Sequence, residues 1–190
     1  MKKDLGTVPA VYPMPVLMIG TYDETGKVDV MNAAWGQICD NDKIFLSLTE
    51  THKTVKNINV SKAFTVALAD KKHVDVADYF GIVSGNRADD KFERTGYHAY
   101  KSEKVNAPII EEFPLVMECE LYDIIDNDYM YGVVGKIVNV KANEEILTGD
   151  KVDVSKADFI MFDQFQNGYY ETGNKVAQAW NAGVELSKKK

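Results

Sequence analysis

The stretch Val16-Leu-Met-Ile-Gly-Thr-Tyr-Asp-Glu-Thr-Gly-Lys-Val-Asp-Val-Met31 indicates the fold class of this 190-residue chain. Residues 16–22 form a short apolar run bounded by a proline and a turn, which is typical of a buried strand. Residues 23–27 have hairpin chemistry because Gly26 can adopt a positive φ. Residues 28–31 then alternate between apolar and polar side chains. A strand, a tight turn and a second strand predict an antiparallel hairpin.

Further elements are expected along the chain. The other expected strands cover residues 44–49, 64–69, 115–125, 130–140 and 159–162. The two longest are joined by Asp126-Asn-Asp128 as a hairpin. Helical patterns are expected at 51–61, 75–83 and 89–94, with an amphipathic closing helix at 176–186 and a solvated tail at 187–190. Residues 96–114 are polar and contain two prolines, which predicts a long irregular connection.

These elements predict the architecture. Strands that come in hairpins, with few helices between them, favour an antiparallel barrel over a doubly wound parallel sheet. We therefore predict a mostly-β fold, a β-barrel with peripheral α-helices. The length suits one domain, and we expect it to cover residues 1–190.

Composition argues against several classes of function. Hydrophobic residues make up 45% and charged residues 27%, the balance of an ordinary globular protein. The net charge of −7 argues against nucleic-acid binding, because phosphate backbones require a basic face. No apolar run reaches the length of a membrane span. Prolines at positions 9, 13 and 15 interrupt the apolar start, so no signal peptide is expected and we predict a cytoplasmic protein.

Cysteines, histidines and short motifs give little sign of catalytic machinery. Cys39 and Cys119 are far apart, and both are expected to be buried as small apolar residues. His52, His73 and His98 show no ligand spacing, so no metal site is expected. Motifs of serine hydrolases, zinc proteases, P-loops and dinucleotide-binding folds are absent from the sequence. We infer that a bound cofactor supplies the reactivity.

The segment Ser47-Leu-Thr-Glu-Thr-His-Lys-Thr54 lies at a predicted strand-to-helix junction. A helix start presents unpaired backbone N–H groups and a partial positive charge, which suit a phosphate. Two sets of side chains could complete such a site: the cations Lys53 and a protonated His52, and the hydroxyl groups of Ser47, Thr49, Thr51 and Thr54. The alternative is that Thr51 caps the helix and the lysine is solvated.

Two more segments are candidates for ligand contact. In Met31-Asn-Ala-Ala-Trp-Gly36, small side chains leave the backbone accessible, and Asn32 can contact a polar ring edge. The alternative is a tight barrel corner with Trp35 in the core. In Asp78-Tyr-Phe-Gly-Ile-Val-Ser-Gly-Asn86 a helix ends, and the nearby Lys91 can reach an anion or remain solvated.

An aromatic cluster, Phe165-Gln-Asn-Gly-Tyr-Tyr170, precedes the expected last helix. Its rings could cover a flat ligand or close the core, and the pattern favours neither.

Six segments, in the same order along the chain, match a known family. They are Pro15-Val-Leu-Met-Ile-Gly20, Met31-Asn-Ala-Ala-Trp-Gly36, Thr51-His-Lys-Thr-Val-Lys-Asn-Ile58, Asp78-Tyr-Phe-Gly-Ile-Val-Ser-Gly85, Asp90-Lys-Phe92 and Phe113-Pro-Leu-Val-Met-Glu-Cys119. Together they resemble the flavin reductase-like, flavoredoxin-type proteins of the FMN-binding split-barrel superfamily. The resemblance implies an antiparallel, Greek-key-type six-stranded split barrel, and a homodimer with tightly bound FMN near the subunit interface.

The resemblance also implies which residues bind the cofactor. The residues implied to line the isoalloxazine ring, largely through backbone groups, are Asn32, Ala33, Ala34 and Trp35. Those implied to hold the ribityl chain and phosphate are Ser47, Thr49, His52, Lys53 and Thr54. Further polar contacts are implied from Ser84 and Lys91, with the partner subunit as one source.

The phosphate segment departs from the family pattern. Many relatives have an arginine there, whereas this chain has His52-Lys53. Lysine pairs with phosphate as a point charge and lacks the bidentate fork of arginine. Which side chain contacts the phosphate is therefore left open.

The resemblance implies an FMN-binding oxidoreductase that takes a hydride from NAD(P)H and passes electrons to a flavin or a small acceptor. An alternative is a non-catalytic, flavoredoxin-like electron carrier that works with protein partners. A third reading is a split-barrel module for another ligand, such as haem. The nicotinamide preference, the acceptor and the role of residues 96–114 are left open by the sequence.

Overall fold

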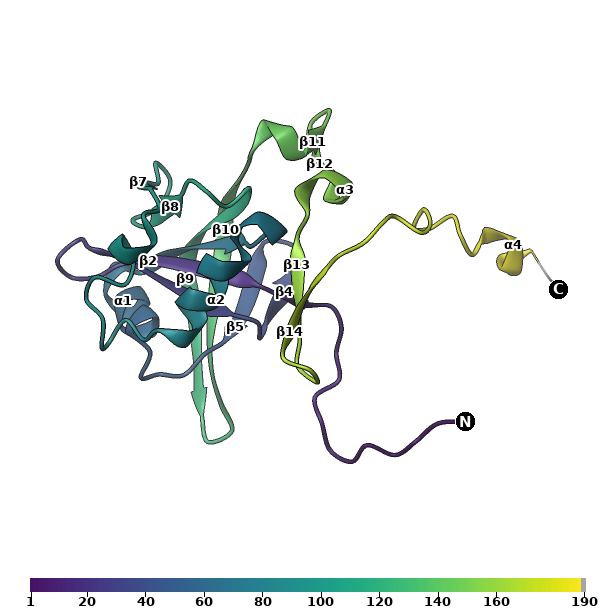
Figure 1. The fold of residues 1–190 in the computed structure, drawn as a ribbon, viewed down its shortest axis with the longest axis horizontal. Coiled ribbons are helices and arrows are strands. Elements are labelled where there is room, and N and C mark those ends of the chain that lie inside the picture. Colours follow the sequence, from purple (N-terminus) through teal and green to yellow (C-terminus); the bar gives the residue numbers. More distant parts are fainter. Residues whose placement is uncertain (189–190) are drawn as a thin grey trace.

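The computed structural model describes residues 1–188 and is built around a seven-stranded antiparallel sheet (Figure 1). Its strand order is β3-β2-β6-β9-β10-β5-β4. The strands are β2 (Leu17–Tyr22), β3 (Val28–Ala33), β4 (Gly36–Asp40), β5 (Lys43–Ser47), β6 (Ala63–Leu68), β9 (Leu115–Asn127) and β10 (Met130–Ala142). Each neighbouring pair is antiparallel, as the hairpin-rich sequence predicts.

Smaller elements surround this sheet. A three-stranded sheet contains β1 (Met14–Pro15), β13 (Ile160–Asp163) and β14 (Gly168–Glu171), and the two-stranded pairs are β7 (Ala99–Lys101) with β8 (Pro108–Ile110) and β11 (Leu147–Thr148) with β12 (Lys151–Val152). The α-helices are α1 (Lys53–Ser61), α2 (Val74–Ile82), α3 (Val154–Ala157) and α4 (Val184–Ser187). Short 3₁₀ turns cover Lys71–His73, Glu93–Thr95 and Glu144–Ile146.

The sheet curls into a barrel because its two end strands are consecutive in the chain. Only Ala34 and Trp35 separate β3 from β4, yet these strands stand at opposite ends of the strand order. Counted as one interrupted strand, β3 and β4 give the six strands predicted for a split barrel. The interruption at 34–35 is where the barrel is split.

The strand β2 is buried on both faces. Leu17 and Ile19 lie in one apolar cluster with Phe64 and Val66, and Val16 and Met18 lie in a second cluster. Successive side chains of a strand point to opposite faces, so an uninterrupted apolar run is required when both faces are covered. This explains the apolar run of residues 16–22.

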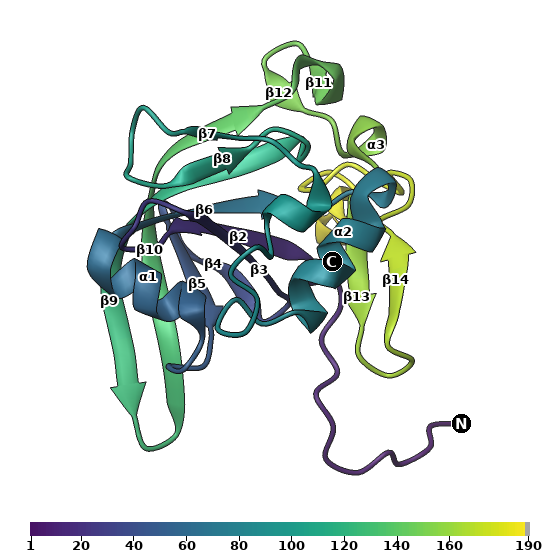
Figure 2. The ribbon, with the colours of Figure 1, turned by 60° about the vertical axis from the view of Figure 1, so that its left-hand side comes forward.

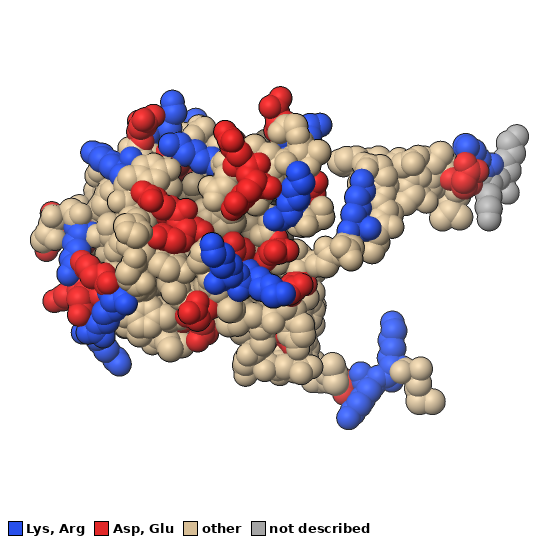
Figure 3. Space-filling view, turned by 45° about the horizontal axis from the view of Figure 1, so that its top comes forward, with Lys and Arg blue, Asp and Glu red and all other residues tan. Residues whose placement is uncertain are grey.

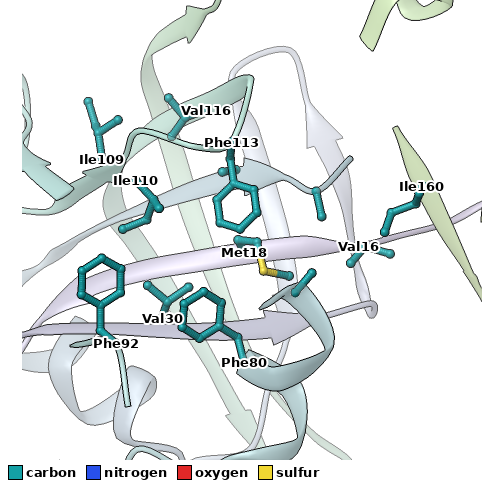
Figure 4. Close-up of a cluster of buried hydrophobic side chains, with 13 residues drawn as sticks. Val16, Met18, Val30, Phe80, Phe92, Ile109, Ile110, Phe113, Val116 and Ile160 are labelled. Atoms are coloured by element: carbon teal, nitrogen blue, oxygen red, sulfur yellow. The ribbon is translucent and has the colours of Figure 1, made fainter. Parts of the chain in front are cut away.

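The second cluster joins the sheet to the peripheral elements. Figure 4 shows Met18 and Val30 from the sheet facing Phe80 of α2 and Phe113. The rings of Phe80 and Phe92 stack with centroids 6.3 Å apart. The packing of α2 against β3 and of α1 against β2 places both helices on the sheet, with β3 between them (Figure 2).

The long hairpin β9–β10 extends beyond the barrel (Figure 2). Each strand has 13 residues, and the register shifts twice along the pair. Near its tip Tyr122 and Tyr129 are 60% and 95% exposed. The hairpin predicted around 126–128 is confirmed, and it presents aromatic side chains to solvent.

The expectation of an irregular connection at 96–114 is wrong in part. Residues 99–110 contain the pair β7–β8, and Val105, Ala107 and Ile109 are buried. The Ser102 hydroxyl also donates to the fully buried carboxylate of Glu118 on β9. The order of this segment was not evident from the sequence, because its apolar residues are scattered among polar ones. Its position depends on contacts with β9, which is distant in the chain.

The expected amphipathic helix at 176–186 is also wrong. Only Val184–Ser187 is helical, and Val176 and Trp180 are 99% and 97% exposed. An amphipathic helix is stabilised mainly by a surface that covers its apolar stripe. The C-terminal segment instead extends away from the barrel, so this surface is missing within the described chain (Figure 1). Of the expected tail, residues 189–190 lie outside the described part.

The cysteine expectation holds for one residue only. Cys119 is fully buried in β9, and burial raises the pKa of its thiol to about 12. Cys39 is exposed in β4, the last strand of the sheet, where residues 37–40 are exposed on both faces. Its short sequence does not show that neither face is covered.

The surface shows charges of both signs. On the face in Figure 3, acidic side chains are interspersed with basic ones and form no continuous basic surface over the described residues. None of the helices within residues 1–188 is long and apolar enough to cross a bilayer.

Candidate functional site

A cavity of about 320 Å³ lies between β3, the start of α1 and the end of α2. Its lining combines backbone groups, two lysines and a carboxylate. The lining residues are Asp29, Met31, Asn32, His52, Lys53, Thr54, Phe80, Gly81, Ile82, Val83, Ser84, Gly85 and Lys91.

The N-terminus of α1 opens into this cavity. The helix begins at Lys53, after His52 with φ −63° and ψ 140°. Within residues 1–188 no side chain caps this start, and its first turn holds no acidic residue. The first backbone N–H groups of a helix lack intrahelical partners, and the helix dipole is positive there. The cavity therefore presents backbone donors suited to an anion.

His52 lies at the mouth of this helix start. Its Nδ1 accepts a hydrogen bond from the backbone N–H of Thr49 at 3.4 Å. Burial and the nearby charge of Lys91 lower the pKa of His52. The imidazole is thus neutral near pH 7 and leaves the positive charge to the lysines.

Two lysines provide that charge. Lys91 is only 4% exposed, and its Nζ donates to the carbonyl oxygen of Phe80 at 2.9 Å. Burial lowers the pKa of Lys91, and the Asp29 carboxylate partly opposes this effect. An ammonium has three donors, so Lys91 retains donors for a ligand. The Nζ of Lys53 lies 3.3 Å from Asp23 Oδ2 and also borders the cavity.

Asp29 was not identified from the sequence. It is 3% exposed, and its Oδ2 accepts a hydrogen bond from Thr54 Oγ1 at 3.0 Å. The alternation of apolar and polar residues at 28–31 could have pointed to Asp29. Residues two apart in a strand share a face, and both Asp29 and Met31 line the cavity. Which face of β3 lines the cavity is decided by α1 and α2, and the local sequence pattern does not show where these helices pack.

Two glycines bring the backbone close to the cavity. A Cβ atom at Gly85 would lie 2.3 Å from Asp29 Oδ1 and 3.1 Å from Lys53 Cδ, so no other residue fits there without displacement. At Gly81 a Cβ would meet Asn32 at an ordinary 3.5 Å. The segment after α2 can therefore lie directly against the carboxylate and the lysine.

Asn32 connects β3 to α2. Its Nδ2 donates to the backbone carbonyl of Ala77 at 2.8 Å. This hydrogen bond fixes the side chain at the wall of the cavity and uses one of its amide donors. A side-chain hydrogen bond to Tyr169 also involves Asn32, so the amide oxygen Oδ1 is the group left for a polar contact to a ring edge.

The structure brings six of the predicted site residues into this one cavity. They are Asn32, His52, Lys53, Thr54, Ser84 and Lys91. Ser84 and Lys91 join it from the same chain as Lys53. Of the two stretches expected to share a cleft, residues 31–32 and 52–54 meet there, whereas 33–36 do not line it.

Five other predicted residues do not line the cavity. They are Ala33, Ala34, Trp35, Ser47 and Thr49. Ser47 lies beside the interruption at 34–35, where its backbone N–H donates to the Trp35 carbonyl at 2.8 Å, and the backbone N–H of Thr49 donates to His52. Trp35 is 54% exposed, so the alternative of a core tryptophan is wrong.

The aromatic cluster 165–170 lies elsewhere. Phe165 stacks on Tyr12 with centroids 6.2 Å apart, and the Tyr169 hydroxyl donates to Asp78 Oδ1 at 2.9 Å. The first contact holds the N-terminal segment against the turn between β13 and β14, and the second joins β14 to α2. Within residues 1–188 no group of three or more His, Cys, Asp and Glu side chains is arranged to hold a metal.

Comparison with known proteins agrees with this geometry. Residues 10–156 match the family described as the flavin reductase like domain. The chain belongs to this family. A flavoredoxin of Desulfovibrio vulgaris (Miyazaki F) is 35% identical, with a TM-score of 0.91 over 96% of this chain and 100% of that chain. The fold and the resemblance inferred from the sequence are thereby confirmed.

Two further proteins are similar to this chain at lower sequence identity. A flavoredoxin from Methanosarcina acetivorans is 26% identical, with a TM-score of 0.88 over 98% of this chain and 99% of that chain. An uncharacterized protein of Aeropyrum pernix is 28% identical over 68% of this chain. The match spans about half of that relative, 51% of its length.

Proposed function

We propose that this protein binds FMN in the cavity between β3, α1 and α2 and takes part in flavin-dependent oxidation and reduction. One observation carries the proposal: the uncapped start of α1 opens into the same cavity as the end of β3. Two lysines border that cavity. This combination of helix N–H groups and cations is suited to a phosphate ester next to an uncharged ligand surface.

The residues present fit FMN. The backbone N–H groups at the start of α1, with Lys53 and Lys91, would hold the phosphate. Ser84 and Gly85 would lie beside the ribityl chain, and the space that a side chain at 85 would need is occupied by Asp29 and Lys53. Asn32 and the backbone at 33–35 would border the ring, with Ser47 and Thr49 next to them at the split of the barrel.

Bound FMN would supply the hydride and electron transfer, and the chain would bind, orient and partly enclose it. We propose NAD(P)H as the reductant and a flavin or a small molecule as the acceptor.

We further propose that the protein forms a homodimer. Trp35 at the split of the barrel and Tyr129 at the tip of β9–β10 are large apolar side chains exposed in the single chain. Exposed aromatic residues are enriched in protein interfaces. Sedimentation of the purified protein would show twice the chain mass of 21.3 kDa if the proposal holds.

A second candidate is an electron carrier without activity of its own. The 35% identity to a flavoredoxin over its whole length favours this alternative. A carrier would use the same FMN cavity but would exchange electrons with a protein partner.

Anaerobic addition of NADH or NADPH to the FMN-loaded protein separates the two candidates. Rapid loss of the oxidised flavin absorbance supports the reductase. An unchanged spectrum, followed by bleaching when a reduced protein donor is added, supports the carrier. A purified protein that neither contains flavin nor binds added FMN would contradict both and favour another ligand.

A further inference from the structure

We propose that Asp29 limits the preference of this cavity for a phosphorylated flavin over riboflavin. The inference rests on the proposed function and concerns the same site. It comes from one juxtaposition: a buried carboxylate shares a small cavity with the uncapped start of α1.

Asp29 is fixed in place. Its side chain is enclosed by the sheet, by α1 and by the segment at Gly85, and it is 3% exposed. Among the described residues that line the cavity, it alone carries a carboxylate. Its Oδ2 accepts the hydrogen bond from Thr54 Oγ1 at 3.0 Å.

The charges in the cavity are nearly balanced before any ligand enters. Two lysines face two carboxylates there, since Lys53 and Lys91 line the cavity with Asp29 and the Nζ of Lys53 also lies 3.3 Å from Asp23 Oδ2. A phosphate monoester carries about −1.5 to −2 charge near pH 7. Buried charges are weakly screened, so the phosphate would be repelled by Asp29 while it is attracted by the lysines and the helix start.

The hydrogen bond to Asp29 also removes a donor from the site. A threonine hydroxyl has one proton, and that of Thr54 is donated to Asp29. The contribution of Thr54 to a phosphate then comes from its backbone N–H. Riboflavin has no phosphate, so the carboxylate should affect its binding far less.

The test compares dissociation constants for FMN and riboflavin, measured by flavin fluorescence, in the wild type and in Asp29→Asn. The asparagine keeps the shape and can still accept the Thr54 hydrogen bond. We expect the ratio of the riboflavin to the FMN constant to rise about tenfold or more, and to stay raised in about 0.5 M salt. Asp89→Asn is the matched control, because Asp89 lines the neighbouring depression beyond Lys53. Its ratio should stay within about twofold of the wild type.

An unchanged ratio in a folded Asp29→Asn protein would overturn the proposal while the FMN site stands. If the wild type binds neither flavin, the proposed function fails as well. Should Asp29→Asn not fold, Asp29→Ser gives the answer, since it also removes the carboxylate charge. We expect the same rise of about tenfold or more in its riboflavin-to-FMN ratio, and a ratio that rises less than about threefold would overturn the proposal.

Discussion

At the scale of single residues, Lys53 has the central position in this account. It is the first residue of α1, its ammonium lies 3.3 Å from Asp23, and its side chain borders the cavity. A lysine side chain that is already held by a carboxylate loses little conformational freedom when a phosphate binds to it. The salt bridge therefore orients the lysine and leaves the backbone N–H groups at the start of α1 free to donate.

Replacing Lys53 with alanine should weaken FMN binding about tenfold or more, because one charge-assisted contact to the phosphate is lost. The rate at which the loaded protein is reduced should change much less. Lys56→Ala is the matched control, since Lys56 lies on the same helix and its Nζ donates to Asn86 at 3.3 Å. Flavin titration followed by stopped-flow reduction measures both quantities. Equal FMN affinity in Lys53→Ala and wild type would argue against the phosphate assignment.

At the scale of elements, the turn between β2 and β3 supports the site. Asp23 Oδ1 accepts hydrogen bonds from the Thr25 hydroxyl and from the backbone N–H groups of Thr25 and Lys27. The turn thus fixes the carboxylate that orients Lys53. The hairpin chemistry of 23–27 was evident in the sequence, but its contact with α1 joins segments that are 30 residues apart.

The contribution of this turn should be measurable in the free energy of unfolding at low pH. Burial raises the pKa of Asp23, but the hydrogen bonds from Thr25, Lys27 and Lys53 outweigh it and lower the pKa to about 2. A carboxyl whose pKa is lowered on folding stabilises the native state above its unfolded pKa of about 3.9, and this stabilisation is lost as the pH falls toward the folded value. Wild type should therefore lose stability between about pH 4 and pH 2 more steeply than Asp23→Asn. Urea unfolding across this range, with Glu24→Gln as the control on the same turn, measures the difference; parallel curves would contradict the prediction.

The sequence predicts elements well where the chemistry is local. The helix start near 52, the hairpin at 23–27 and the paired long strands followed from turn residues, apolar runs and a change of period. Asp29 could not be assigned to a site because its alternating strand does not show which face α1 and α2 cover. The prediction of a helix at 176–186 was wrong for a different reason. Its apolar stripe is present in the sequence, but within the described chain no surface packs against that stripe.

At the scale of the whole molecule, two arms leave the body. The N-terminal segment and residues 172–188 extend from the barrel, and the C-terminal arm carries Val176 and Trp180 in almost full exposure (Figure 1). Buried apolar area is the main source of folding free energy. Side chains that bury no area within the chain contribute little to its stability.

Deleting residues 176–190 should leave the thermal unfolding midpoint of the barrel within about 2 °C of the full chain at low protein concentration. Flavin content should also persist, because the cavity is lined by residues 29–91. Differential scanning calorimetry and an absorbance spectrum measure the two. A large fall in the midpoint would show that the arm is packed on the barrel in solution.

The central claim is that the start of α1 and the end of β3 form one phosphate-and-ring site. A crystal structure of the FMN complex tests it most directly. We predict the phosphate within hydrogen-bond distance of the backbone N–H groups that follow His52, with the ring extending toward residues 32–35. Flavin bound on the other side of the barrel, with the cavity at Lys53 and Lys91 holding only water, would contradict the claim.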